Sequence, residues 1–260
     1  FPSLTGYIAD PLINLVIMLL IVIGGIGFLT WDDFCTNKWN LKRYRLQSKI
    51  ILVTTAVLIL LPAIFFFLSD FAGFSMGKRI LASFFQSVTL RTAGFNTADL
   101  GAMNDSSKAI MTLMMLIGGS PGSTAGGMKT TTIAVLILNA FATFGREPET
   151  EVFGRRFDNT VVKNAATIAI LYFFLFFTGG IAISQIEHVA LSDCLFETAS
   201  AVGTAGLTLG ITTELGLVSH LILVVLMYLG RVGGLTLIYA AISVKIQSGA
   251  KRPLDKITVG

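Results

Sequence analysis

The chain has 260 residues, of which 53% are hydrophobic and only 13% are charged. A soluble domain carries roughly 25% charged residues, so this composition excludes an ordinary soluble fold and favours an all-α, multi-pass membrane protein. The formal net charge is +4, but the charges cluster between apolar stretches, which argues against nucleic acid as a partner and for contact with membrane lipids.

Five stretches are long and apolar enough to cross a bilayer, which takes about 20 residues. In chain order they are residues 11–30, 50–68, 107–144, 161–185 and 217–244. The third is far too long for one simple crossing, so we expect a break within it. Pro11 opens the first stretch, where a helix tolerates proline because the missing N–H is not needed.

The basic residues predict the orientation. Thirteen of the 19 Lys and Arg residues lie in segments 31–49, 142–163 and 245–260. Cytoplasmic loops are enriched in Lys and Arg, so we expect a cytoplasmic C-terminus, with Phe1 outside the cell membrane. Cys35 and Cys194 then lie on opposite sides and cannot pair within the chain.

Two apolar stretches, residues 78–90 and 191–202, are too short to cross. A segment containing glycine follows each. Such stretches are typical of re-entrant pore helices, whose irregular ends must contact protein or water rather than lipid.

The two short stretches belong to an internal repeat. Thr92-Ala93-Gly94 recurs 112 residues later as Thr204-Ala205-Gly206, with Phe84 and Phe196 in the same register. A second echo aligns Gly24, Gly27, Leu29 and Thr30 with Gly230, Gly233, Leu235 and Thr236. We therefore expect two units of span, pore loop and span, at 49–160 and 161–260. Residues 1–48 would be the last span of a preceding unit plus a cytoplasmic loop, and the start midway through a unit suggests missing upstream residues.

Four motifs carry a resemblance to a known family. They are SVTLRTAGFN (Ser87 to Asn96), IGGSPGSTAGGMKTTT (Ile117 to Thr132), SAVGTAGLTLGIT (Ser200 to Thr212) and GRVGGLTL (Gly230 to Leu237). With them the chain resembles, over essentially its whole length, the membrane subunit of Ktr-type bacterial potassium uptake systems in the Ktr/Trk/HKT superfamily. The match corresponds to the second half of the second repeat and to the third and fourth repeats.

The resemblance implies a pore of four pseudo-symmetric repeats that carries potassium and is stimulated by sodium. It also implies a homodimer, with the C-terminal Gly260 at the dimer interface, seated on a cytosolic nucleotide-binding regulatory ring. This chain itself is expected to bind no nucleotide. Gly127-Met128-Lys129-Thr130 departs from the phosphate-loop spacing after Gly122 by one residue, and no strand precedes it.

The resemblance assigns a potassium selectivity filter to the two repeated segments. The expected filter residues are Arg91, Thr92, Ala93, Gly94, Phe95, Gly203, Thr204, Ala205, Gly206 and Leu207. Backbone carbonyls can replace the hydration shell of an ion, and glycine tolerates the positive φ that aims successive carbonyls inward. A plain glycine turn is the alternative interpretation.

The break in the third span is expected to be a gating loop beneath the filter. It comprises Gly118, Gly119, Ser120, Pro121, Gly122, Ser123, Thr124, Ala125, Gly126 and Gly127. Proline and clustered glycine interrupt a helix, and a structural kink is the alternative. The two intramembrane cations, Lys129 and Arg231, should face the protein interior. By resemblance Arg231 helps to close the pore, whereas Lys129 could instead cap a helix or extend to the cytoplasm.

Two acidic residues near the second pore helix, Asp193 and Glu197, could attract cations at the pore mouth, although helix capping explains Asp193 equally well. An enzyme is not expected, because the spans offer no carboxylate pair, HExxH or GxSxG motif. His188 and His220 are isolated, so no transition-metal site is expected either. The remaining alternatives are a sodium or non-selective cation transporter of the same superfamily and a scaffold subunit without a pore.

Overall fold

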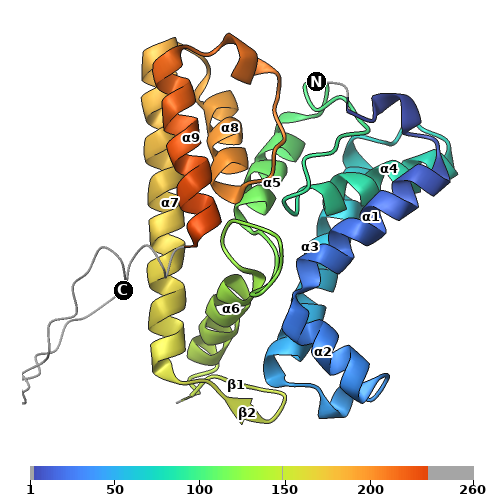
Figure 1. The fold of residues 1–260 in the computed structure, drawn as a ribbon, viewed down its shortest axis with the longest axis vertical. Coiled ribbons are helices and arrows are strands. Elements are labelled where there is room, and N and C mark those ends of the chain that lie inside the picture. Colours follow the sequence, from blue (N-terminus) through green and yellow to red (C-terminus); the bar gives the residue numbers. More distant parts are fainter. Residues whose placement is uncertain (1–2, 148, 234–260) are drawn as a thin grey trace, which may run out of the picture.

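The computed structural model describes residues 3–147 and 149–233. Figure 1 shows a mainly helical chain whose elements lie side by side, and the all-α class expected from the sequence is confirmed. One small exception is an antiparallel hairpin of β1 (Glu151–Val152) and β2 (Arg155–Arg156). Short 3-10 helices occur at Thr5–Tyr7, Leu41–Arg43 and Ile211–Glu214.

The first predicted span is not one straight helix. Helix α1 (Pro11–Ile26) ends before Gly27, and the chain bends by 95° into α2 (Phe28–Asn37). Gly27 has φ +90°, a conformation that side chains with a Cβ rarely adopt. The expectation of an unbroken span over residues 11–30 is therefore wrong, because a run of apolar residues does not reveal where a glycine turns the backbone.

The next unit follows the predicted order. Helix α3 (Leu46–Ser69) corresponds to the predicted second span, and α4 (Met76–Thr89) is the first short pore helix. The long third stretch is broken as expected, into α5 (Asp105–Leu116) and α6 (Thr130–Phe144).

The last unit repeats this order. Helix α7 (Asn159–Glu187) is followed by the short α8 (Leu191–Gly203) and by α9 (Leu217–Val232). The remainder of the predicted fifth span, up to residue 244, lies outside the described residues, as do Leu235, Thr236 and Gly260.

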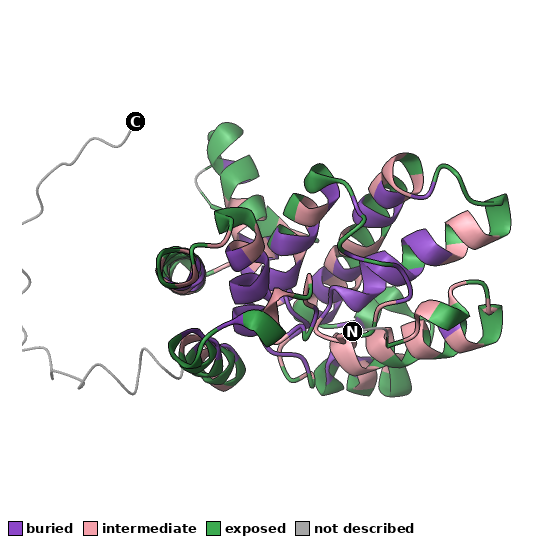
Figure 2. Cartoon of the chain, turned by 90° about the horizontal axis from the view of Figure 1, so that it is seen from above, coloured by how far each residue is buried: buried purple, intermediate pink, exposed green. Residues whose placement is uncertain are grey.

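Within the described residues, α3 and α7 are long and apolar enough to cross a membrane alone, and the bent pair α1 and α2 would make a third span. Helices α6 and α9 are apolar but shorter. Many large apolar side chains on these helices are exposed, and Figure 2 shows exposed residues on the periphery around a buried centre. This distribution suits helices whose outer faces contact lipid. Five crossings remain a prediction.

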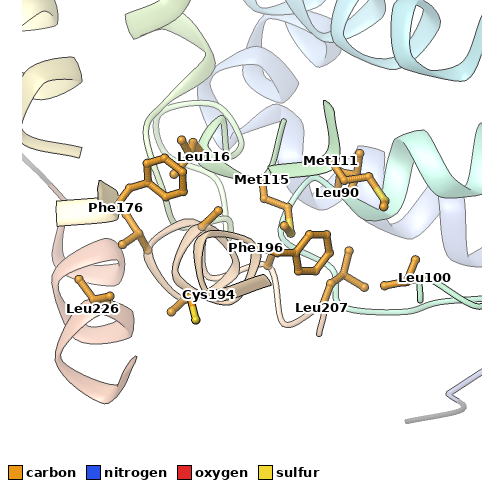
Figure 3. Close-up of a cluster of buried hydrophobic side chains, with 14 of the residues drawn as sticks. Leu90, Leu100, Met111, Met115, Leu116, Phe176, Cys194, Phe196, Leu207 and Leu226 are labelled. Carbon is orange, nitrogen blue, oxygen red and sulfur yellow. The ribbon is translucent and has the colours of Figure 1, made fainter. Parts of the chain in front are cut away.

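The buried centre surrounds α8, which contacts α5, α7 and α9. Figure 3 shows Phe196 of α8 beside Met115 of α5 and Leu207, with Phe176 and Leu226 nearby. Because α8 is enclosed by protein, the irregular backbone at its end is shielded from lipid, as an unpaired backbone requires in a bilayer.

The same hydrogen-bonding device holds three helix N-termini. A carboxylate from the preceding part of the chain accepts one bond from the N–H of the N-cap residue and another from a buried serine three positions later. The carboxylates are Asp33 (to Arg45 and Ser48 of α3), Asp70 (to Asn104 and Ser107 of α5) and Glu187 (to Gly216 and Ser219 of α9). We call these three arrangements carboxylate staples. They satisfy donors that a helix start would otherwise leave unpaired.

Candidate functional site

The two repeated Thr-Ala-Gly sequences share one backbone conformation. We call residues 91–95 the first TAG segment and residues 203–207 the second. The threonines, Thr92 and Thr204, have φ of 60° and 54°, and the glycines, Gly94 and Gly206, have φ of 76° and 80°. A left-handed β-branched residue is a rare conformation. Its occurrence at the same place in both units shows that the sequence repeat is also a structural repeat.

The two segments touch each other through their backbones. A Cβ built on Gly94 would lie 2.9 Å from the carbonyl oxygen of Ala205 and 3.4 Å from the Cα of Gly206. Only glycine at position 94 therefore allows this approach. The segments come from pore helices 112 residues apart in register, and a cavity of about 610 Å³ lies beside them, lined by Gly94, Ser200, Thr204, Gly206, Met227 and Arg231, among others.

The break between α5 and α6 is a compact loop closed at its neck. Gly118 donates its N–H to the carbonyl of Met128 at 2.8 Å, and Met128 donates to Leu116 at 3.2 Å. The far side of the loop lies against the second TAG segment, since a Cβ on Gly126 would lie 2.1 Å from Oγ1 of Thr204. The loop and this segment therefore form one contact surface.

The bend after α1 holds the same loop from another side. Thr124 and Ser120 donate their N–H groups to the carbonyls of Gly24 and Gly25, at 3.4 and 2.9 Å. Phe28, just after the bend, donates in return to the carbonyl of Gly122 at 3.2 Å.

Helix α9 makes the matching contact. The carbonyl of Gly230 accepts the N–H of Gly127 at 3.2 Å, as that of Gly24 accepts Thr124. Gly27 and Gly233, aligned in the second sequence echo, have nearly equal φ of 90° and 91°. Close packing within the chain explains Gly230, because a Cβ there would lie 2.0 Å from the carbonyl oxygen of Val202.

Three cationic side chains reach carbonyls of this loop. Nη1 of Arg231 donates to Thr124 at 2.5 Å, and Nζ of Lys129 donates to Ala125 at 2.6 Å. Arg91, which is buried, donates from Nη2 to Gly118 at 3.4 Å. No carboxylate in the described part of the chain lies within ion-pair distance of these three groups. Their positive charge is therefore concentrated at the loop without local neutralisation.

Each predicted gating residue can thus be placed. Arg231 contacts the loop as the resemblance implied, and Lys129 folds back onto the loop rather than extending to solvent. Lys129 occupies the N-cap position of α6, but its side chain makes no capping bond there.

Sequence reasoning missed the side chain of Arg91. It was expected to contribute a filter carbonyl, yet its guanidinium links the first TAG segment to the loop. A charge inside an apolar segment was the available indication, because such a residue usually faces a partner or a pathway.

The expectation for Glu197 is wrong. This residue is only 4% exposed, and its carboxylate accepts bonds from Thr208, Leu209 and Thr212 rather than facing the pore mouth. Asp193 lies in the first turn of α8, but the helix has no side-chain cap. The register partners Phe84 and Phe196 also differ, since Phe84 is 36% exposed and Phe196 is fully buried.

Comparisons with known proteins place the chain. A sequence profile described as "TrkH: Cation transport protein" matches residues 45–250. The chain is 33% identical to "Ktr system potassium uptake protein B" of Bacillus subtilis, over 99% of this chain and 59% of that protein. It is 34% identical to "Potassium/sodium uptake protein NtpJ" of Enterococcus hirae, over 95% and 57%.

A solved structure agrees on the fold. The potassium transporter TrkH from Vibrio parahaemolyticus superposes with a TM-score of 0.75 at 21% identity, covering 92% of this chain and 54% of that one. The chain thus spans less than two thirds of these relatives. The resemblance read from the four motifs is confirmed, and the chain belongs to the TrkH family of cation transport proteins.

Proposed function

We propose that this chain provides two filter segments of a membrane pathway for potassium. The carrying observation is the shared left-handed threonine and positive-φ glycine in two touching segments. Carbonyl groups on such a backbone can take the place of water around a cation. The names of the relatives, which include potassium uptake proteins, support potassium as the ion.

The loop at residues 118–127 is proposed as the gate of this pathway. It lies against the second TAG segment and is tied by hydrogen bonds to α1 and α9. Arg231 and Lys129 hold adjacent carbonyls of the loop and would present a positive barrier to cations, as charged groups do in other selective pores. Arg91 would couple the first TAG segment to the gate.

The proposed setting is a cell membrane, with repeat units at residues 49–160 and 161–260 and a cytoplasmic C-terminus. In a fourfold pore, two further filter segments would complete the ring. Membership in a Ktr-like system would also bring a homodimer and a cytosolic nucleotide-binding ring, with Gly260 at the dimer interface. The similarity to proteins named as Ktr system components supports this arrangement.

Sodium is the second candidate ion. It is favoured by the similarity to a protein named as a potassium/sodium uptake protein. Each TAG segment also has a single glycine, compared with the longer Gly-Tyr-Gly run of potassium channels, so fewer carbonyl layers are available for discrimination.

The filter proposal is tested by Gly94→Ser and Gly206→Ser, expressed from the complete gene in cells that lack other potassium uptake. A side chain at positive φ costs about 1–2 kcal/mol, which corresponds to roughly a tenfold change in ion discrimination. Gly94→Ser should be the more severe change, because its Cβ would also lie 2.9 Å from the Ala205 carbonyl oxygen.

Rubidium uptake and its inhibition by sodium are the measurements. Gly77→Ser is the control, since a Cβ at that position meets nothing within 4 Å. Unchanged uptake and selectivity in both TAG variants would reject the filter assignment.

A further inference from the structure

The buried carboxylate of Glu197 gathers three donors from the segment that follows the second TAG segment. Its Oε1 accepts the hydroxyl of Thr208 at 2.6 Å and the N–H of Leu209 at 3.0 Å. Its Oε2 accepts the hydroxyl of Thr212 at 2.6 Å. Glu197 belongs to α8, so these bonds fold the outgoing chain back onto the pore helix that leads into the segment.

This arrangement fixes the second TAG segment at both of its ends. At the near end, Thr204 and Ala205 donate their N–H groups to carbonyls of α8, at 3.0 and 2.8 Å. At the far end, Thr208 comes directly after Leu207 and is held by Glu197. Only four residues, 204–207, lie between the helix end and the carboxylate contact.

We propose that Glu197 is a positioning residue that sets the conformation, and hence the ion selectivity, of the second TAG segment. The inference rests on the proposed filter function. It assigns Glu197 no contact with the ion, because its oxygens are occupied by Thr208, Leu209 and Thr212.

The chemistry requires a carboxylate at this position. An ionised carboxylate only accepts hydrogen bonds and can serve several donors at once. Bonds to a charged acceptor are shorter and stronger than neutral ones, and a buried charge is tolerated only when it is bonded in this way. A glutamine would place an NH₂ donor against one of the three donors and leave an unfavourable contact.

The other repeat lacks this support. The position 112 residues before Glu197 is Phe85, which is fully buried. The first TAG segment is held instead by the Thr89 hydroxyl, which donates to the Phe95 carbonyl, and by Ser3, whose hydroxyl accepts the N–H of Asn96 at 2.9 Å. The effect of Glu197 should therefore be confined to the second segment.

The test compares Glu197→Gln with Thr212→Val and with the double variant, each expressed from the complete gene. Two variants serve as controls: Asp193→Asn, a carboxylate earlier on α8, and Thr213→Val, whose hydroxyl bonds Gly210 and not Glu197. The measurements are rubidium uptake, its inhibition by sodium, the amount of protein in the membrane and its thermal unfolding temperature.

Glu197→Gln should weaken discrimination against sodium by about tenfold. Thr212→Val should change it in the same direction by less, and the double variant should not exceed Glu197→Gln. The controls should behave as wild type. A purely structural role would lower protein amount and unfolding temperature without changing selectivity, and that result would overturn the proposal.

If Glu197→Gln does not fold, Thr212→Val and Thr208→Val carry the test, because they keep the carboxylate and the side-chain shape. Wild-type selectivity in both would overturn the inference. If Gly94→Ser and Gly206→Ser change selectivity while the Glu197 and threonine variants do not, this inference fails and the filter stands. If none of them does, the filter assignment itself fails.

Discussion

Asp33, Asp70 and Glu187 each fasten the start of a later helix, through one backbone N–H and one serine hydroxyl. Asp33 is the most deeply buried of the three, at 3% exposure. Its neighbour Asp32 forms only a surface ion pair, at 2.8 Å from Arg45. Adjacent residues of the same type thus differ sharply in their contribution to stability.

Replacing Asp33 by Asn should lower the free energy of unfolding by about 1–3 kcal/mol, because bonds from Arg45 and Ser48 lose their charged acceptor. Replacing Asp32 by Asn should change it by less than about 1 kcal/mol, as expected for an exposed pair. Thermal unfolding of the two purified variants in detergent measures the difference. Equal unfolding temperatures would show that the staple adds nothing.

At the residue scale, the sequence predicted the TAG segments and the contact of Arg231 with the loop, because motif and repeat spacing are local properties. It did not predict the partners of Arg91 or Glu197. Their bonding depends on which segments meet in space, and in Glu197 an interior carboxylate looks the same in sequence as one at a pore mouth.

At the scale of elements, the bend between α1 and α2 is part of the gate region. Gly27 lies so close to the loop that a Cβ would sit 2.6 Å from the Pro121 carbonyl oxygen. The backbone groups on either side of the bend form hydrogen bonds with the loop. The bend therefore supports the closed arrangement of residues 118–127.

Replacing Gly27 by Ala should push the loop away and increase basal rubidium leak from vesicles, because a side chain at φ +90° adds about 1–2 kcal/mol of strain to the clash. Gly25→Ala is the matched control. A Cβ there meets nothing within 4 Å, and alanine retains the carbonyl that accepts Ser120. A leak that is the same in both variants would separate the bend from gating.

The helices themselves were largely predictable. Apolar length located α3 and α7, and the shortness of α4 and α8 marked them as non-spanning. The bend at Gly27 and the hairpin at residues 151–156 were missed. The hairpin turns on Phe153 and Gly154, both with positive φ, and a phenylalanine gives no indication of such a turn.

At the scale of the whole molecule, two repeats place their TAG segments in contact and share one loop beneath them. This geometry accounts for a family of cation transport proteins in which irregular backbone is buried rather than exposed to lipid. Composition and charge predicted the membrane setting, since both are averages over the chain. Ion preference could not be predicted in this way, because it depends on carbonyl positions set by all segments around the pathway.

Uptake of radioactive rubidium by vesicles containing the purified protein, expressed from the complete gene, tests the central claim most directly. The filter account predicts uptake above that of empty vesicles, competition by excess potassium, and a loss of about tenfold in discrimination against sodium in Gly94→Ser. Uptake no greater than in empty vesicles, or identical selectivity in wild type and Gly94→Ser, would contradict it.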